Sequence, residues 1–171
     1  MKIVCIFAEK LFAFHYENER LDEYGRLLGL WNDPEYILDF AEKNEQYLNK
    51  RGLSTDNFIE QILTDVEILE ENLLYYKNER CKIDTCFQPL YDQEYRPKIL
   101  SFQKKKCKYL RLYAIRIDEN CFVITGGAIK LTQTMQEHPD TTNELEKLNQ
   151  CKNYLLSENV FDEDSFFEIT G

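Results

Sequence analysis

The chain has 171 residues and a formal net charge of −10, with 43% hydrophobic and 30% charged residues. This composition excludes a disordered chain, and the length suits one domain over residues 1–171, with a core that needs neither disulfides nor metal. The first residues, MKIVCIFAEKLF, contain Glu9 and Lys10 and no small-residue cleavage site, so they do not predict a signal peptide. No apolar stretch has membrane-spanning length, and we expect a cytoplasmic protein.

The six cysteines are expected to be free thiols, because disulfides are rare in a reducing cytoplasm. Cys81 and Cys86 have a spacing that could form half of a metal site. The chain offers only His15 and His138 as further soft ligands and no second close cysteine pair. We therefore predict no metal site and no cofactor.

In chain order, the apolar residues of 1–16 predict a strand followed by a second short extended piece at 11–16. Residues 17–33 are polar and include two glycines, which predicts a connector that could contain a helical turn. Asp33 followed by Pro34 is typical of a helix start, Gly52 of a helix end, and 54–56 of a second start. Apolar residues recur at helical spacing after both starts, so 33–78 is predicted to be a helical hairpin.

Residues 96–134 are predicted to form the core of the sheet. Two apolar runs, 109–117 and 121–125, are joined by the polar link Asp118-Glu119-Asn120, as in an antiparallel hairpin. A weaker extended run at 98–103 is expected to pair alongside, and 85–90 to contain a short strand. Residues 96–130 hold nine Lys and Arg against two acids, a local net charge of +7, so the rest of the chain carries −17.

The last predicted helix covers about 143–156 and precedes an acidic, aromatic tail. Strands grouped after the first helices, without strict alternation, indicate an α+β domain. We expect an antiparallel sheet of about four to five strands, with the 33–78 hairpin on one face and a C-terminal helix.

Alternation along 107–117 assigns side chains to the two faces of this sheet. Leu110, Leu112 and Ala114 are the natural surface for burial under the helices. Tyr109, Arg111 and Tyr113 then lie on the opposite face, predicted to be open. An arginine between tyrosines on an open sheet suits RNA binding, since bases stack and phosphates need cations. The alternative is a solvated face on which Arg111 pairs with local acids.

The segment RLYAIRIDENCFVITGGAIKLT, residues 111–132, resembles the sheet core of the RelE/ParE toxin superfamily, especially its HigB-like branch. The order of strand, helical hairpin, strands and last helix is similar too. The resemblance implies an mRNA endoribonuclease, free or on the ribosome, that needs no metal and is held inactive by a cognate antitoxin. The chain departs from the family in its acidic balance and in a single lysine where a basic pair is common.

The resemblance also implies the residues of the site. Arg111 matches the family's strand arginine, Lys130 a basic residue after the apolar strand, and Tyr154 a late proton-transfer residue, for which His138 is a second candidate. The RNA-binding residues implied by the family or by the tyrosine-flanked face are Lys98, Lys108, Tyr109, Tyr113 and Arg116.

Two other hypotheses stay open. The chain could be a non-catalytic binding module that presents the basic sheet face to an acidic protein partner, as the acidic balance of the chain favours. It could also be an α+β protein with neither role. The expected position of Arg111 and Lys130 on adjacent elements favours the toxin hypothesis.

Overall fold

The computed structural model describes residues 1–78, 87–89, 98–102, 107–132 and 138–170. Its helices are α1 Glu23–Trp31, α2 Pro34–Lys43, α3 Glu45–Lys50, α4 Thr55–Asn78, α5 Pro139–Ser157 and α6 Glu163–Thr170. Its strands are β1 Lys2–Phe7, β2 Leu11–His15, β3 Phe87–Pro89, β4 Lys98–Phe102, β5 Leu110–Asp118 and β6 Cys121–Ile129. The predicted α+β class is therefore confirmed.

One sheet contains all six of these strands, in the order β1-β2-β6-β5-β4-β3. The predicted four to five strands were too few. Four neighbouring pairs are antiparallel, but β2 runs parallel to β6 with Leu11 opposite Phe122, so the sheet is mixed. The predicted neighbours β5 and β6 do lie side by side at the sheet centre. The predicted strand at 85–90 lies partly outside the described residues, and β3 is its described part.

The predicted helical hairpin corresponds to α2, α3 and α4. The Asp33 side chain accepts a hydrogen bond from the Glu35 amide, with Pro34 in the first helical turn. Gly52 has φ +63°, a conformation that favours glycine, and it separates α3 from α4. The Phe40 and Phe58 rings stack at 6.1 Å between centroids and join α2 to α4.

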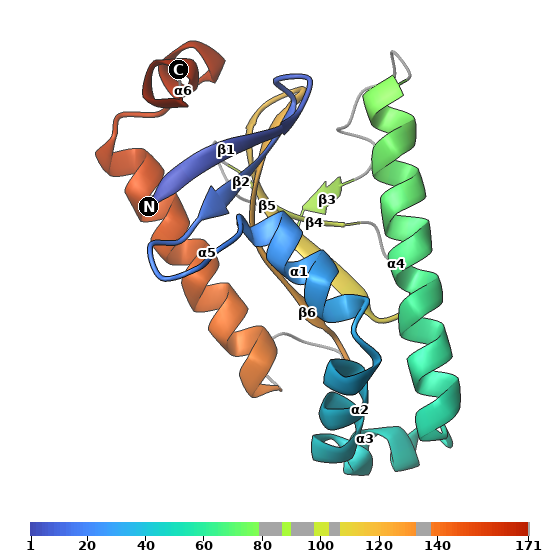
Figure 1. Cartoon of the computed structure of the whole chain (residues 1–171). Helices are drawn as coiled ribbons and strands as arrows, with labels where there is room; N and C mark the ends of the chain where they lie inside the picture. Colours follow the sequence, from blue (N-terminus) through green and yellow to red (C-terminus); the bar gives the residue numbers. More distant parts are fainter. Residues whose placement is uncertain (79–86, 90–97, 103–106, 133–137, 171) are drawn as a thin grey trace.

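Helices cover both faces of the central strands, where the sequence predicted a covered and an open face. We call these the α4 face and the α5 face, and Figure 1 shows the strands between the two helices. On the α4 face Leu110, Leu112 and Ala114 join the large apolar core, as predicted. On the α5 face Ile115 and Ile117 pack with residues of α5 and α6.

A bulge divides β6 into a first and a second part along its length. Tyr113 lies opposite Gly126 but Ala114 lies opposite Ile124, so Thr125 is the extra residue. The bulge reverses which residues of β6 point to each face: Phe122 and Ile124 precede it on the α4 face, and Ile129 follows it there. The connector predicted at 17–33 contains α1, which packs against β6 beyond the bulge.

Candidate functional site

The beginning of β5 is held by a carboxylate from α4. The fully buried Asp65 side chain accepts hydrogen bonds from the backbone amides of Lys108, Tyr109 and Leu110, at 3.0, 2.6 and 3.1 Å. These amides would otherwise have no acceptor where the strand starts, and bonds to an ionised acceptor are the stronger kind. Asp65 thereby fixes the position of Lys108 and its neighbours.

Two cations lie against the Tyr109 ring at this end of the sheet and a third residue, Lys130, is bonded to its backbone. We call Arg51, Lys108, Lys130 and Tyr109 the basic edge. The Lys130 amide donates to the Tyr109 carbonyl at 2.8 Å, which places the end of β6 beside the start of β5. Lys108 Nζ lies 5.4 Å and Arg51 Cζ 5.9 Å from the centre of the Tyr109 ring. Both distances suit cation–π contacts.

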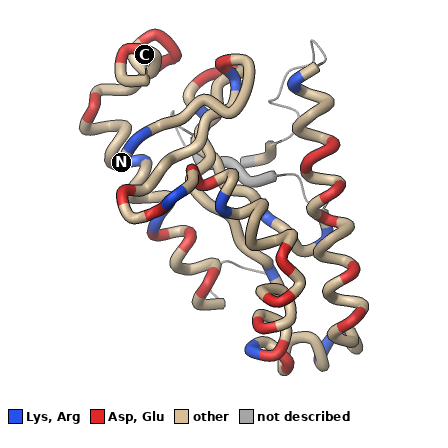
Figure 2. Tube along the Cα trace, viewed as in Figure 1, with Lys and Arg blue, Asp and Glu red and all other residues tan. Residues whose placement is uncertain are grey.

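Two cations of the basic edge, Lys108 and Arg51, are available to an anion. Lys108 and Arg51 are exposed, and within the described part of the chain neither has a carboxylate partner. Arg51 donates instead to the Leu131 carbonyl. By contrast, acidic residues follow α2 and α4 in Figure 2. The basic edge is therefore a local cationic surface on an acidic chain. Lys108 and Lys130 belong to the predicted basic segment 96–130, whereas Arg51 does not. The lysines at 104–106 lie outside the described residues.

Arg111 does not lie on an open face, so that prediction is wrong. It is 8% exposed and donates through Nη1 to the carbonyls of Cys107 and Leu110, at 3.2 and 2.7 Å. Burial lowers the pKa of its guanidinium. Tyr113, on the same face, is 1% exposed. The physical reason is α5, whose Leu148 packs in one cluster with Tyr113 and Ala128.

Tyr109 also differs from its predicted position. It belongs to the core of the α4 face and is 3% exposed, with its ring 5.5 Å from that of Phe58. It therefore supports the surrounding cations and does not offer a ring face for stacking a base.

The remaining predicted RNA-binding residues lie at the far end of β5. Arg116 donates through Nε to the Asp118 carbonyl at 3.3 Å, and its backbone is paired with that of Lys98. Eight residues of extended chain separate Arg116 from Lys108, roughly 26 Å. The predicted patch is thus divided between the two ends of the strand. The side chain of Lys98 lies outside the described residues.

Tyr154 is not brought to the basic edge. Its ring packs edge-on against Phe14 of β2, 6.1 Å between centroids. Phe14 follows Ala13, which is opposite Ile124, whereas Arg111 is opposite Ala128. This register separates Tyr154's packing partner from Arg111 by two strand spacings and three residues, roughly 14 Å. A shared reaction centre for Tyr154 and Arg111 is therefore absent from this arrangement.

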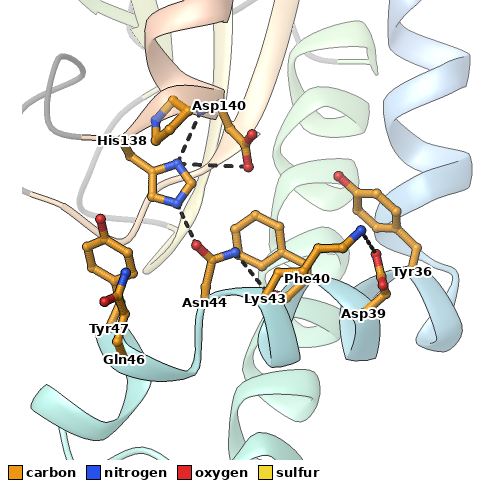
Figure 3. A pocket seen from close by; sticks show the side chains of 10 residues that line it. Tyr36, Asp39, Phe40, Lys43, Asn44, Gln46, Tyr47, His138 and Asp140 are labelled. Atoms are coloured by element: carbon orange, nitrogen blue, oxygen red, sulfur yellow. Dashed lines mark hydrogen bonds and ion pairs between the residues drawn. The ribbon is translucent and has the colours of Figure 1, made fainter.

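His138 caps the start of α5 and uses both ring nitrogens (Figure 3). Nδ1 accepts from the Asp140 amide at 3.2 Å, so Nε2 carries the hydrogen and donates to Asn44 Oδ1 at 2.6 Å. The Asn44 amide in turn donates to the Phe40 carbonyl at 2.8 Å. Both His138 and Asn44 are buried, and they form the floor of a cleft of about 490 Å³ between α2 and α5. His138 is better suited to holding α5 in place than to proton transfer.

A buried polar cluster joins α1 to α5, and the sequence predicted none of it. The Glu23 carboxylate is fully buried, receives two hydrogen bonds from Arg26 at 2.9 and 2.7 Å, and contacts Lys147. The Tyr16 hydroxyl donates to the Thr125 carbonyl at 2.6 Å. Residues 23 and 147 are 124 positions apart, so no local signal could have predicted their pairing.

Two side chains beside this cluster, Cys151 and Tyr16, are suited to packing and not to nucleophilic chemistry. Cys151 Sγ lies 3.1 Å from the Tyr16 hydroxyl, and burial raises the pKa of its thiol to about 11. Burial raises the pKa of Tyr16 as well. A thiol with a raised pKa is a poor nucleophile near neutral pH.

Comparison with family models, with curated proteins and with solved structures finds no match to this chain. Within the described residues no three His, Cys, Asp or Glu side chains gather as a metal site. The four described cysteines, Cys5, Cys107, Cys121 and Cys151, are free thiols, whereas Cys81 and Cys86 lie outside the described residues. Among the described helices, none has the length and apolar character needed to cross a bilayer.

Proposed function

We propose that this chain is a RelE/HigB-like mRNA endoribonuclease, the toxin component of a type II toxin–antitoxin pair that inhibits translation. The basic edge carries the proposal, because it concentrates Arg51, Lys108 and Lys130 at the paired ends of β5 and β6 on a chain of net charge −10. The arrangement of a first strand, a helical hairpin, an antiparallel run and a last helix supports it, since the resemblance of residues 111–132 implies the same order.

In this proposal the basic edge binds the RNA backbone. Cleavage by the 2′-hydroxyl places extra negative charge on the phosphate in the transition state, and fixed cations stabilise that charge selectively. Lys108 and Arg51 are exposed, so they contact phosphate first, and Lys130 lies beside them. Arg111 lies behind them, with its guanidinium bonded to the carbonyls of Cys107 and Leu110, and it keeps the strand end rigid. Tyr154 has no part in this site.

The cognate antitoxin would cover the same surface in the cytoplasm. An acidic segment matches the three cations, and opposite charges accelerate the encounter. Association should therefore slow as the salt concentration rises.

A second candidate function is a non-catalytic binding module that presents the basic edge to an acidic protein partner. The inward orientation of Arg111 and the distance of Tyr154 favour it, because, of the three predicted catalytic residues, only Lys130 lies at the basic edge. Both functions predict that an acidic protein segment binds the basic edge. Only the toxin is predicted to cleave RNA.

The test compares wild type with Lys108→Glu/Lys130→Glu, expressed in bacteria without an antitoxin. The control is Lys2→Glu/Lys77→Glu, which makes the same charge change at two exposed lysines elsewhere. Growth is followed, and reporter mRNA is mapped for cleavage. We expect wild type and control to arrest growth and cut the reporter, and the basic-edge variant to do neither.

Salt titration of RNA binding gives an independent measurement. Loss of two phosphate contacts should reduce the slope of log affinity against log salt by roughly 1.4 for a single strand. RNA binding with this slope but no cleavage by folded wild type would favour the binding module. Neither cleavage nor binding would contradict both functions.

A further inference from the structure

Beyond the bulge, β6 has a free edge within the described part of the sheet. β2 pairs with β6 only over Leu11–Ala13 and Phe122–Ile124. Residues 126–129 continue the strand and pair with β5 on their other side. No described strand lies beside them on the side of β2.

The backbone groups of Gly127 and Ile129 point to this free edge. The Lys130 amide donates to the carbonyl of Tyr109 directly opposite, so hydrogen-bonded pairs along the two strands fall at every second residue from there. Ala128 and Gly126 therefore bond to β5, and the residues between them direct their N–H and C=O groups away from it. Among the described residues nothing is bonded to these groups of Gly127 and Ile129.

Helices cover the two faces of this segment, and all of its residues are buried, so its edge is reached only through the space between α1 and α5. At Gly127 the α1 side chains of Trp31 and Leu27 lie against the α4 face, and at Gly126 the α5 carboxylate of Glu144 lies against the other. Between them is a cavity of about 180 Å³, which we call the notch. It shares Tyr36, Phe40 and Asp140 with the larger cleft of Figure 3, so the two lie next to each other, and we call them together the groove.

The charge balance of this groove favours a cation. Oε2 of Glu144 is buried and has no hydrogen-bond partner, while Oε1 is 3.5 Å from Lys147 Nζ. Burial raises the pKa of this carboxyl. The basic side chains that line the groove are already paired, Arg26 with Glu23 and Lys43 with Asp39 at 2.6 Å.

Asp140 adds to this excess of acids. Its carboxylate lies 3.8 Å from His138 Nδ1, but that nitrogen accepts a hydrogen bond from the Asp140 amide and so carries no proton to compensate the charge. The rings of Tyr36, Phe40 and Tyr47 line the rest of the groove, and aromatic rings also attract cations.

We propose that the notch binds an extended, basic peptide segment of a partner protein, which adds as a strand to the free edge of β6. The alternating donors and acceptors of Gly127 and Ile129 match the spacing of an extended backbone. An arginine or lysine of the segment contacts the buried oxygen of Glu144, and the next basic side chain enters the cleft of Figure 3. The proposal does not depend on the basic edge or on RNA cleavage.

The test is an NMR titration of the full ¹⁵N-labelled chain with the acetylated, amidated pentapeptide Val-Arg-Val-Arg-Val. We expect saturating shifts at the amides of Gly127 and Ile129. The peptide Val-Glu-Val-Glu-Val should leave these amides unchanged. Glu144→Gln should weaken binding of the basic peptide about tenfold, because a charge-assisted bond is lost. Glu146→Gln, a change at an exposed residue of the same helix, should not.

Several results would overturn the proposal. These are an absence of shifts at Gly127 and Ile129 with millimolar peptide, shifts confined to the outer edge of β1, and equal binding of the acidic peptide. Shifts of the same amides that grow with protein concentration alone would identify a second copy of the chain as the occupant and would also overturn it.

Discussion

The α4 face and the α5 face of the central strands are packed by different means. On the α4 face, side chains of β5 and β6 meet α1 and α4 in one continuous apolar core. On the α5 face, the apolar packing is divided into two clusters. Polar side chains lie between and beside these clusters, among them Arg111, Tyr113 and Glu144, whereas the buried carboxylate of α4, Asp65, lies at the start of β5.

This difference indicates that the α4 face contributes most of the stability and that the α5 face determines the position of α5. Apolar packing stabilises in proportion to the area removed from water and has no directional requirement. A buried polar group must find partners at fixed distances, so it determines where α5 lies and contributes less net stability. We therefore expect substitutions on the α4 face to cost more than those on the α5 face.

The largest effect is expected from Leu112→Ala on the α4 face. Leu112 is 1% exposed, and its truncation leaves a cavity between β5 and the helices. The free energy of unfolding, measured in urea, should fall by about 2–5 kcal/mol. The control Leu112→Met, which keeps the volume, should cost less than about 1.5 kcal/mol. Similar costs for both would mean that this face is not tightly packed.

The adjacent glycines of β6 compare the two faces directly. A Cβ on Gly127 would lie 2.7 Å from Trp31 and 2.8 Å from the Arg111 carbonyl, so backbone would have to move. On Gly126 it would overlap with Glu144 Oε2, the end of a flexible side chain. Gly127→Ala should lower the unfolding free energy by about 2–3 kcal/mol and Gly126→Ala by less. The reverse order would contradict the comparison.

Glu144→Gln tests the electrostatic character of the α5 face. Burial raises the pKa of Glu144 in the folded chain, so the folded state binds this proton more tightly than the unfolded state does. Stability from this group is therefore present below about pH 4 and decreases as pH rises through the folded pKa. Between about pH 4 and about pH 7 the variant should lose less stability than wild type. If plots of unfolding free energy against pH run parallel for the two proteins, the carboxyl of Glu144 makes no such contribution.

Tyr113→Phe should have the smallest effect, although Tyr113 is the neighbour of Leu112. Its buried hydroxyl has no hydrogen-bond partner among the described residues, and burial raises its pKa. Removing an unpaired hydroxyl removes a desolvation cost, so the unfolding free energy should change by less than about 1 kcal/mol, in the stabilising direction. A clear loss of stability would show that the hydroxyl is bonded in solution.

The α4 face was predictable from sequence because its signals are local. Asp33, Pro34 and Gly52 delimit the first half of the hairpin, and alternation along β5 assigns Leu112 to the covered face. The same alternation correctly placed Arg111 on the other face. It cannot predict what packs on a face, since that depends on how the last helix returns to the sheet.

The helices α1 and α6 also have local signals in the sequence. Asp22 caps α1 by accepting from the Gly25 amide, and Asp162 accepts from the Ser165 amide at the start of α6. Both are ordinary N-cap residues in polar segments that we interpreted as a connector and a tail. The pairing of Glu23 with Lys147 and of β2 with β6 depends on residues more than one hundred positions apart, and one sequence contains no signal for it.

The parallel pairing of β2 with β6 also determines when the chain can fold. Leu11 is synthesised early, but its partner Phe122 leaves the ribosome only after 110 intervening residues. Until then β1 and β2 are a two-stranded hairpin, which is marginally stable alone, and contacts of such long sequence separation form slowly. The ends of β5 and β6 that form the basic edge are also made late. A nascent chain therefore acquires its cationic surface only after the residues up to Lys130 have been made.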